Sequence, residues 1–126
     1  MTKGEFTKYV KENYGVTPDN PFKDFDAMIF RHKHNRKWFA LIMQVSSDKI
    51  SGYKNNGKTK NLDILDLKTD PLIRADMLRK RGVYTAYHMN KVHWLTINLE
   101  EIDINDLEFL LDLSYNLTKE KKRSAK

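Results

Sequence analysis

Hydrophobic and polar residues alternate most clearly in the last third of the chain. Leu95, Ile97 and Leu99 occupy every second position, which predicts a strand over His93–Leu99 with these side chains against a core. The intervening side chains, Trp94, Thr96 and Asn98, belong to the other sheet face. We expect that face to be exposed, and the alternative is that another element or a second subunit covers Trp94. The preceding run, Val83–His88, predicts a partner strand, and the short polar segment between the two runs predicts a hairpin turn.

Three further apolar runs predict strands nearer the N-terminus. They are Phe25–Arg31, Trp38–Val45 and Leu62–Lys68. The polar segment 32–37 separates the first two runs and predicts a hairpin with a basic tip. The segment Ser46–Lys60 is the least regular of the chain, and we interpret it as a mobile basic connection with one helical turn near residues 47–51.

Capping signals and helical spacing predict a helix at each end of the chain. Thr2 and Glu5 form a capping box, and the helix that they begin extends to about Tyr14. Asp103 begins the last helix, which gives way to a basic tail over residues 119–126. The expected buried face of this last helix consists of Leu107, Leu110, Leu111 and Ser114, and it is widened by Phe109, Leu113 and Leu117.

A third helix is predicted between the two groups of strands. Asp70 provides its N-cap, and Pro71 takes the first helical position, where a missing N–H costs nothing. The cations of Arg79–Arg81 occupy its last turn, where they suit the helix dipole, and Gly82 ends it. We expect its buried stripe to consist of Leu72, Ile73, Met77 and Leu78.

These elements follow the chain in the order helix, three strands, helix, two strands, helix. The order predicts an α+β fold, a two-layer sandwich in which an antiparallel sheet carries the helices mainly on one face. The 126 residues fit one domain with a core of its own. We assign that domain to residues 1–118 and expect residues 119–126 to form a disordered basic tail.

Composition and charge narrow the class of protein. The chain lacks cysteine, which excludes a disulfide framework and fits a reducing compartment. An apolar signal segment and a bilayer-spanning run are both missing from the sequence, so we expect a cytoplasmic protein with no membrane partner. Residues 31–60 hold eight basic side chains and one acidic one, whereas residues 95–112 hold six acidic side chains and no basic one. One region therefore suits anions and another repels them.

Two predicted turns combine cations with aromatic or histidine side chains. Cations can neutralise phosphates while an indole stacks on a base, so we interpret the turns as a nucleic-acid surface with DNA as the expected partner. The candidate binding residues are Lys33, His34, Arg36, Lys37, His88, Asn90, Lys91, His93 and Trp94, with Arg79, Lys80 and Arg81 as an auxiliary patch. Solvated turns without a binding role are the alternative interpretation.

Other kinds of site find less support in the sequence. His32 and His34, and also His88 and His93, invite a metal interpretation, but no cysteine, His-Glu-x-x-His motif or carboxylate cluster accompanies them. We expect no metal or other cofactor, and no catalytic signature indicates an enzyme. Two alternatives stay open: a homodimer or protein-interaction module that uses the exposed sheet face, and a small-ligand binder or enzyme at the second turn.

Three short segments resemble those of a known family. Tyr87–Trp94, with the sequence Tyr-His-Met-Asn-Lys-Val-His-Trp, is similar to a signature of the MmcQ/YjbR family. Leu67–Pro71 resembles the start of that family's middle helix, and Leu113–Leu117 resembles its final helix. The similarity extends from the first helix to about Leu117.

The resemblance carries expectations about fold and function. It implies the same order of helices and strands, and a fold like that of the bacterial frataxin homologue and the type III secretion chaperones. It also implies DNA binding through a pair of hairpin wings, which are His32–Lys37 and Met89–Val92 in this sequence. Frataxins bind iron through an acidic first helix, whereas this first helix contains Lys3, Lys8 and Lys11, so we do not extend iron binding to this chain.

Overall fold

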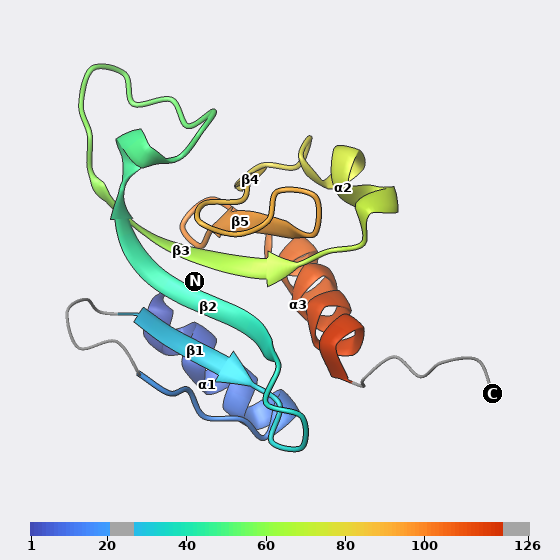
Figure 1. Ribbon diagram of the computed structural model, residues 1–126. Helices are drawn as coiled ribbons and strands as arrows, with labels where there is room; N and C mark the ends of the chain where they lie inside the picture. Colours follow the sequence, from blue (N-terminus) through green and yellow to red (C-terminus); the bar gives the residue numbers. More distant parts are fainter. Residues whose placement is uncertain (21–26, 120–126) are drawn as a thin grey trace.

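The computed structural model describes residues 1–20 and 27–119, which form an α+β sandwich of two layers (Figure 1). The order of helices and strands is the predicted one, with a short 3-10 turn added. The elements are α1 Lys3–Tyr14, β1 Ala27–Arg31, β2 Trp38–Ser46, η1 Ser47–Lys49, β3 Asn61–Lys68, α2 Pro71–Met77, β4 Val83–Thr85, β5 Trp94–Asn98 and α3 Ile104–Lys119. The beginning of the first predicted strand, at Phe25, and the predicted tail after Lys119 lie outside the described residues.

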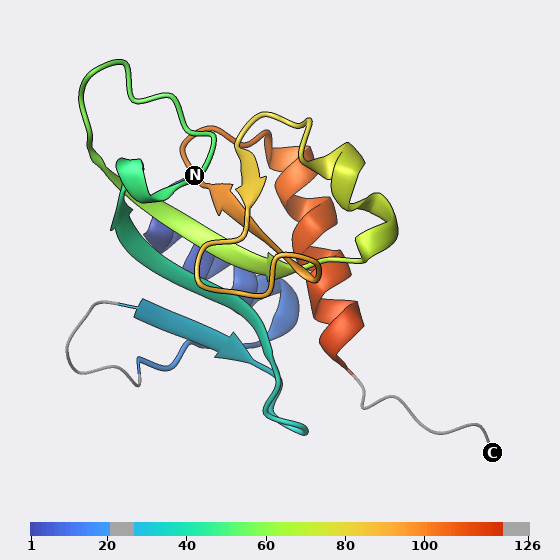
Figure 2. The same cartoon turned by 45° about the horizontal axis from the view of Figure 1, so that its top comes forward.

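One antiparallel sheet holds the strands in the order β1-β2-β3-β5-β4. β3 lies at its centre and pairs with β2 on one side and β5 on the other. After β3, α2 leads the chain to the outer edge of the sheet, where β4 forms, and β5 then returns to the position between β4 and β3 (Figure 2). This path makes the connection from β4 to β5 emerge at the end of the sheet where β3 finishes.

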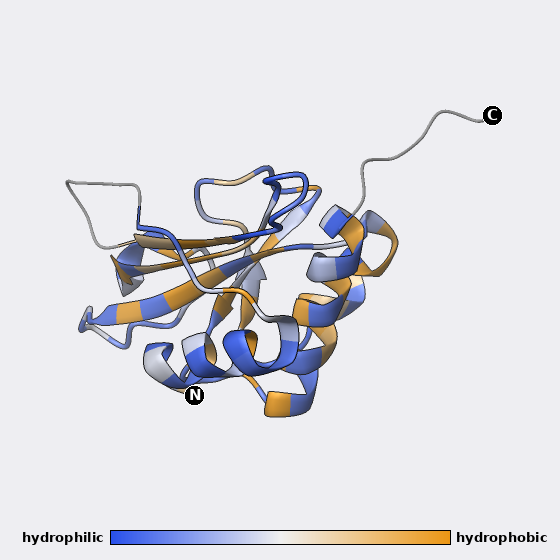
Figure 3. Cartoon of the chain, turned by 90° about the horizontal axis from the view of Figure 1, so that it is seen from below, coloured by the Kyte–Doolittle hydropathy of each residue, from blue (hydrophilic) through white to orange (hydrophobic). Residues whose placement is uncertain are grey.

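α1 and α3 lie side by side on one face of the sheet (Figure 3). The predicted capping box is present, since Glu5 N–H donates to Thr2 Oγ1 at 3.1 Å and Thr2 N–H donates to a Glu5 carboxylate oxygen at 2.8 Å. The main core between helices and sheet includes Phe6, Val10, Phe30, Phe39, Ile42, Leu65, Leu67, Leu95, Ile97, Leu107, Leu110 and Leu111. The predicted widening of the buried face of α3 is wrong at Phe109 and Leu117, which are exposed. None of the helices in the described ranges is long and apolar enough to cross a membrane.

α2 differs from its prediction in length and in burial. Asp70 caps it as expected and accepts a hydrogen bond from Leu72 N–H at 2.9 Å, but the helix ends at Met77 and buries none of its residues. The predicted buried stripe is wrong at Leu72, which is 89% exposed. A short helix that bridges the middle and the edge of the sheet reaches the core only at its end, through Met77 and Leu78. Arg79–Arg81 follow the helix instead of forming its last turn.

The second face of the sheet is covered, so the prediction of an exposed face is wrong. Thr96 is 0% exposed and Asn98 is 1% exposed. The connection after β2 packs Ile50 and Tyr53 against this face, and the connection after β4 adds Tyr87. The 47–60 segment is thus held against the sheet instead of being free, and its predicted helical turn is present as η1.

Gly82 is required where the segment after α2 turns into β4. Its φ is 83°, a conformation that other residues rarely adopt, and a Cβ at this position would lie 2.7 Å from the backbone nitrogen of Ile102. The backbone of β4 can therefore approach the turn before α3 closely.

Candidate nucleic-acid interface

Both candidate loops leave the sheet at the same end. The hairpin 32–37 ends at Trp38, the first residue of β2, and the loop 86–93 ends at Trp94, the first residue of β5. Trp94 pairs with Lys68, the last residue of β3, and β3 finishes beside the start of β2. The strand ends therefore form a row, Trp38, Lys68 and Trp94, with one loop beyond each side of the row.

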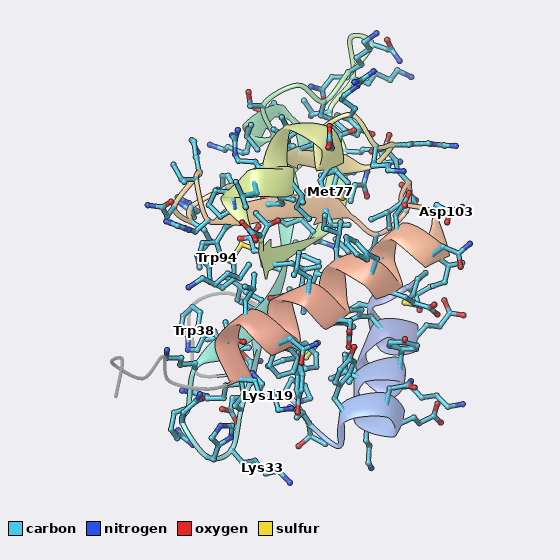
Figure 4. All side chains as sticks on the ribbon, turned by 90° about the vertical axis from the view of Figure 1, so that its right-hand side faces the viewer. Lys33, Trp38, Met77, Trp94, Asp103 and Lys119 are labelled. Atoms are coloured by element: carbon cyan, nitrogen blue, oxygen red, sulfur yellow. The ribbon has the colours of Figure 1, made fainter. Side chains whose placement is uncertain are left out.

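The chain contains two tryptophans, and both belong to this row (Figure 4). Trp94 lies on the face opposite the helices, because it alternates with Leu95, which is buried in the helix-facing core. Trp38 packs against the small cluster around Leu41 on that same face. Both residues are half-buried, so packing fixes part of each residue and the remainder faces solvent. Lys68 is also half-buried and comes from the strand between them.

Three exposed cations project from the tip of the 32–37 hairpin. Arg36 has a φ of 64°, and its N–H donates to the carbonyl of His32 at 3.0 Å, which closes the turn. Lys33, Arg36 and Lys37 have no carboxylate partner within the described part of the chain. Their charges are available to an external anion.

The other polar side chains of this hairpin contact the C-terminal end of α3. Nε2 of His32 lies 2.9 Å from Oγ1 of Thr118, and Nδ2 of Asn35 donates to the carbonyl of Thr118 at 2.9 Å. Nε2 of His34 contacts the carbonyl of Lys119. Carbonyls in the last turn of a helix have no partner within the helix, so these side chains cap α3. The structure gives His34, a predicted binding residue, a capping contact. Asn35 caps the same helix end, although no sequence pattern had indicated it.

The 86–93 loop is longer than the predicted turn. β4 ends at Thr85, so the strand predicted as far as His88 is wrong over its last residues. His88 has a φ of 63°, which is incompatible with a strand. Oδ1 of Asn90 accepts hydrogen bonds from the N–H groups of Val92 at 2.9 Å and His93 at 3.1 Å. A side-chain oxygen that holds two backbone donors competes with strand pairing and shapes the loop.

Lys91 ties this loop together and connects it to α2. Its ammonium donates to the carbonyl of Ala86 at 2.7 Å, across the loop, and its own carbonyl accepts a hydrogen bond from Nε of Arg74 at 2.6 Å. The residue remains exposed, as do His88 and His93. These two hydrogen bonds thus hold the charged side chain of Lys91 in place at the same end of the sheet as Lys68. Arg74 gave no signal in the sequence.

A buried carboxyl group lies beneath the 86–93 loop. Asp66 is 0% exposed, and one of its oxygens accepts a hydrogen bond from Oγ1 of Thr96 at 2.5 Å. Thr96 in turn accepts a hydrogen bond from Tyr87 N–H at 2.8 Å. The second oxygen, Oδ2, has no partner among the residues described. Burial raises the pKa of Asp66 to about 7, and the Thr96 hydrogen bond and the Lys91 charge oppose that rise.

The auxiliary patch lies at the other end of the sheet. Arg79–Arg81 come just before β4, whose start adjoins the end of β5, where Asn98 N–H donates to the carbonyl of Gly82 at 2.8 Å. Lys80 forms an ion pair with Asp106 at 3.7 Å in this region. The structure therefore does not bring these three cations together with the two loops.

Comparison with known proteins gives the family of this chain. The family model described as YjbR matches residues 12–117. The chain belongs to the YjbR family. A relative in Bacillus subtilis (strain 168), the uncharacterized protein YyaQ, is 36% identical over 121 residues, which are 94% of this chain and 99% of that protein. The resemblance found in the sequence is thus confirmed.

Solved structures share the fold of this YjbR-family chain. A crystal structure of a protein from Pseudomonas syringae has 36% sequence identity and a TM-score of 0.86, and the match covers 94% of this chain and 99% of that one. A protein from Deinococcus radiodurans has 22% identity and a TM-score of 0.67, with 98% and 82% of the two chains covered. The second likeness concerns the fold alone. The function of this chain has to be argued from its own surface.

Proposed function

We propose that this YjbR-family protein binds nucleic acid, in particular DNA, through one end of its sheet. The surface, which we call the wing surface, consists of Lys33, Arg36, Lys37, Trp38, Lys68, Lys91 and Trp94. Its cations neutralise phosphates, which gives affinity without sequence preference, and its indoles stack on accessible bases.

The positions of Trp38 and Trp94 carry the proposal. The indoles come from β2 and β5, and the two strands are separated by β3 alone, which contributes Lys68 to the row between them. A cationic loop lies beyond each indole. Aromatic rings bordered by cations are the arrangement with which proteins hold single strands of any sequence, because every base has a flat face. Since the bases of a duplex are stacked on one another, we expect single-stranded DNA to bind at least as tightly as duplex DNA.

Salt dependence and phosphate contacts are linked in this proposal. We count four phosphate contacts, which are made by the exposed cations Lys33, Arg36, Lys37 and Lys91. Four such contacts predict that the association constant falls roughly 50- to 150-fold between about 50 and 200 mM salt. The measurement is fluorescence anisotropy of a labelled oligonucleotide, single-stranded or duplex, titrated with the protein at the two salt concentrations.

Two charge-matched triple variants make this test specific. We expect Lys33→Gln, Arg36→Gln and Lys37→Gln together to weaken binding and to flatten the salt dependence, with the logarithmic slope lower by about 2. Lys54→Gln, Arg79→Gln and Arg81→Gln together remove the same charge at the other end of the sheet and leave binding unchanged. Lys91 stays in place in both variants, because its ammonium holds the Ala86 carbonyl. Absence of binding at low salt, or equal losses in both variants, contradicts the proposal.

A further inference from the structure

β4 forms an edge of the sheet that no other strand covers in the part of the chain described here. The opposite edge, at β1, is different. There Asp19 and Ile29 exchange two backbone hydrogen bonds of 2.8 Å, so the segment before β1 covers part of that edge. An uncovered edge offers N–H and C=O groups to an added strand. In β4 the N–H of Val83 already donates to the carbonyl of Lys80 at 3.3 Å, so the added strand pairs with the remaining groups of this edge.

A groove lies beside this uncovered edge. Its volume is about 770 Å³, and it is lined by residues 51, 52 and 54 of the connection after β2, by residues 78–85, and by Glu101. Tyr84, the middle residue of β4, contributes its ring, which lies 6.0 Å from the ring of Tyr53. The groove therefore follows the length of β4 and has one wall made by the 47–60 connection.

The groove is positively charged, and its cations can contact an external anion. Lys54, Arg79 and Arg81 are exposed and form no ion pair with another described residue. The one carboxylate that lines the groove, Glu101, already accepts hydrogen bonds from the Tyr84 hydroxyl at 2.6 Å and from Nδ2 of Asn98 at 2.9 Å. Three cations thus surround a strand edge while the acidic group beside them is engaged within the protein.

We propose that this groove binds an acidic, extended segment of another protein, which adds a strand to β4. The backbone of the segment pairs with β4, and its carboxylates contact Lys54, Arg79 and Arg81. A peptide fits better than a nucleic acid, because a strand edge supplies hydrogen bonds in the spacing of a peptide backbone. Both tryptophans lie at the opposite end of the sheet, so no indole is here to stack on bases. The inference does not depend on the proposed binding of DNA.

Labelled peptides of about eight residues test this inference by fluorescence anisotropy with the full chain. The probe alternates glutamate with valine. One control peptide replaces glutamate with lysine, and a second keeps the sequence but carries N-methyl groups on alternate backbone nitrogens, which prevents strand pairing. We expect saturable binding of the unmodified acidic peptide alone. We expect Lys54→Gln, Arg79→Gln and Arg81→Gln together to weaken it about tenfold, and Lys33→Gln, Arg36→Gln and Lys37→Gln together to leave it unchanged.

Several outcomes overturn the inference. If the N-methylated peptide binds as tightly as the unmodified acidic peptide, then charge alone attracts the peptide and no strand is added to β4. Displacement of the peptide by a single-stranded oligonucleotide that loses affinity in the Lys54, Arg79 and Arg81 variant shows a nucleic-acid groove. No binding of any peptide shows that the basic residues merely protect the edge. Circular dichroism of both triple variants establishes that they are folded, and DNA binding of the wing surface is measured separately, so failure of one proposal is distinguishable from failure of the other.

Discussion

At the scale of the residue, Asp66 is a buried carboxyl group whose protonation affects the stability of this protein. It lies fully buried under the 86–93 loop with one oxygen bonded to Thr96 and the other without a partner among the described residues. A buried ionised carboxylate that lacks partners costs several kcal/mol, and protonation relieves that cost. The loop that carries Lys91 therefore rests on a group whose charge changes near neutral pH.

The raised pKa of Asp66 predicts a specific pH dependence of stability. The pKa is about 7 in the folded chain and close to 4 in an unfolded chain. Between these values the folded chain binds more protons, so the free energy of unfolding falls as the pH rises. From pH 5 to pH 8 we expect Asp66 to lower it by about 2 to 3 kcal/mol. Urea denaturation of the wild type and of Asp66→Asn at both pH values isolates the contribution of Asp66 to this change in the free energy of unfolding, because asparagine does not titrate. Parallel pH profiles of the two proteins contradict the assignment.

The alternation of apolar and polar residues in β5 correctly predicted which side chains share a face of the sheet. It did not predict that the face opposite the helices is also buried. Leu95 and Ile97 are in the core as predicted, whereas Thr96 is buried on the face that the sequence left open. The period of a strand reports which side chains share a face, and it contains no information about what covers that face. Here the cover comes from Ile50 and Tyr87, which lie outside the strand itself.

At the scale of elements, the first hairpin and the last helix stabilise each other. Nδ2 of Asn35 donates to the carbonyl of Thr118 at 2.9 Å and to that of Lys119 at 3.0 Å. His32 adds a contact to the carbonyl of Tyr115 at 3.1 Å. The hairpin is thereby held in a fixed orientation, and the exposed cations on it are positioned by contacts that belong to the fold.

Asn35→Ala tests this junction. The substitution removes both donations to the last helical turn, and it also removes the Asn35 Oδ1 that accepts a hydrogen bond from Lys37 N–H at 2.9 Å. The Lys119 carbonyl keeps its contact with His34. We expect a loss of about 1 kcal/mol in the free energy of unfolding together with faster amide exchange in the last turn of α3. Asn116→Ala is the matched control, because among the described residues the Asn116 amide bonds only to Asp112 in the same helix. We expect the control to leave stability nearly unchanged. Equal effects of the two substitutions indicate that the junction is not needed.

Element boundaries show where local sequence patterns fail. The α1 boundaries follow from Thr2 and Gly15, which act within a few residues of the ends that they determine. The end of β4 depends instead on contacts made by the residues that follow it: Tyr87 N–H donates to Oγ1 of Thr96 at 2.8 Å, and His88 has a φ of 63°. The sequence contains Asn90 in a plausible turn position, but it does not show that the loop also binds Arg74 of α2. Contacts between segments decide such boundaries.

On the scale of the whole molecule, α3 runs from an acidic segment to the cationic first hairpin. The helix begins next to Asp103 and ends near Lys33 and Trp38 (Figure 4). The negative end of its dipole thus favours the cations of the first hairpin. At the other end, Glu100 pairs with Lys60 at 3.0 Å. The basic block 31–60 was interpreted from the sequence as one anion-binding region, whereas the fold divides it between the two ends of the sheet.

Intrinsic fluorescence tests the central claim most directly, because both tryptophans of the chain belong to the wing surface. The measurement is a titration of the protein with oligothymidylate at low salt while tryptophan emission is recorded. We predict saturable quenching that needs more oligonucleotide in the Lys33→Gln, Arg36→Gln, Lys37→Gln variant, and less quenching in Trp94→Phe. Emission that does not change while the oligonucleotide binds, or binding that is equally tight in the triple variant, contradicts the account.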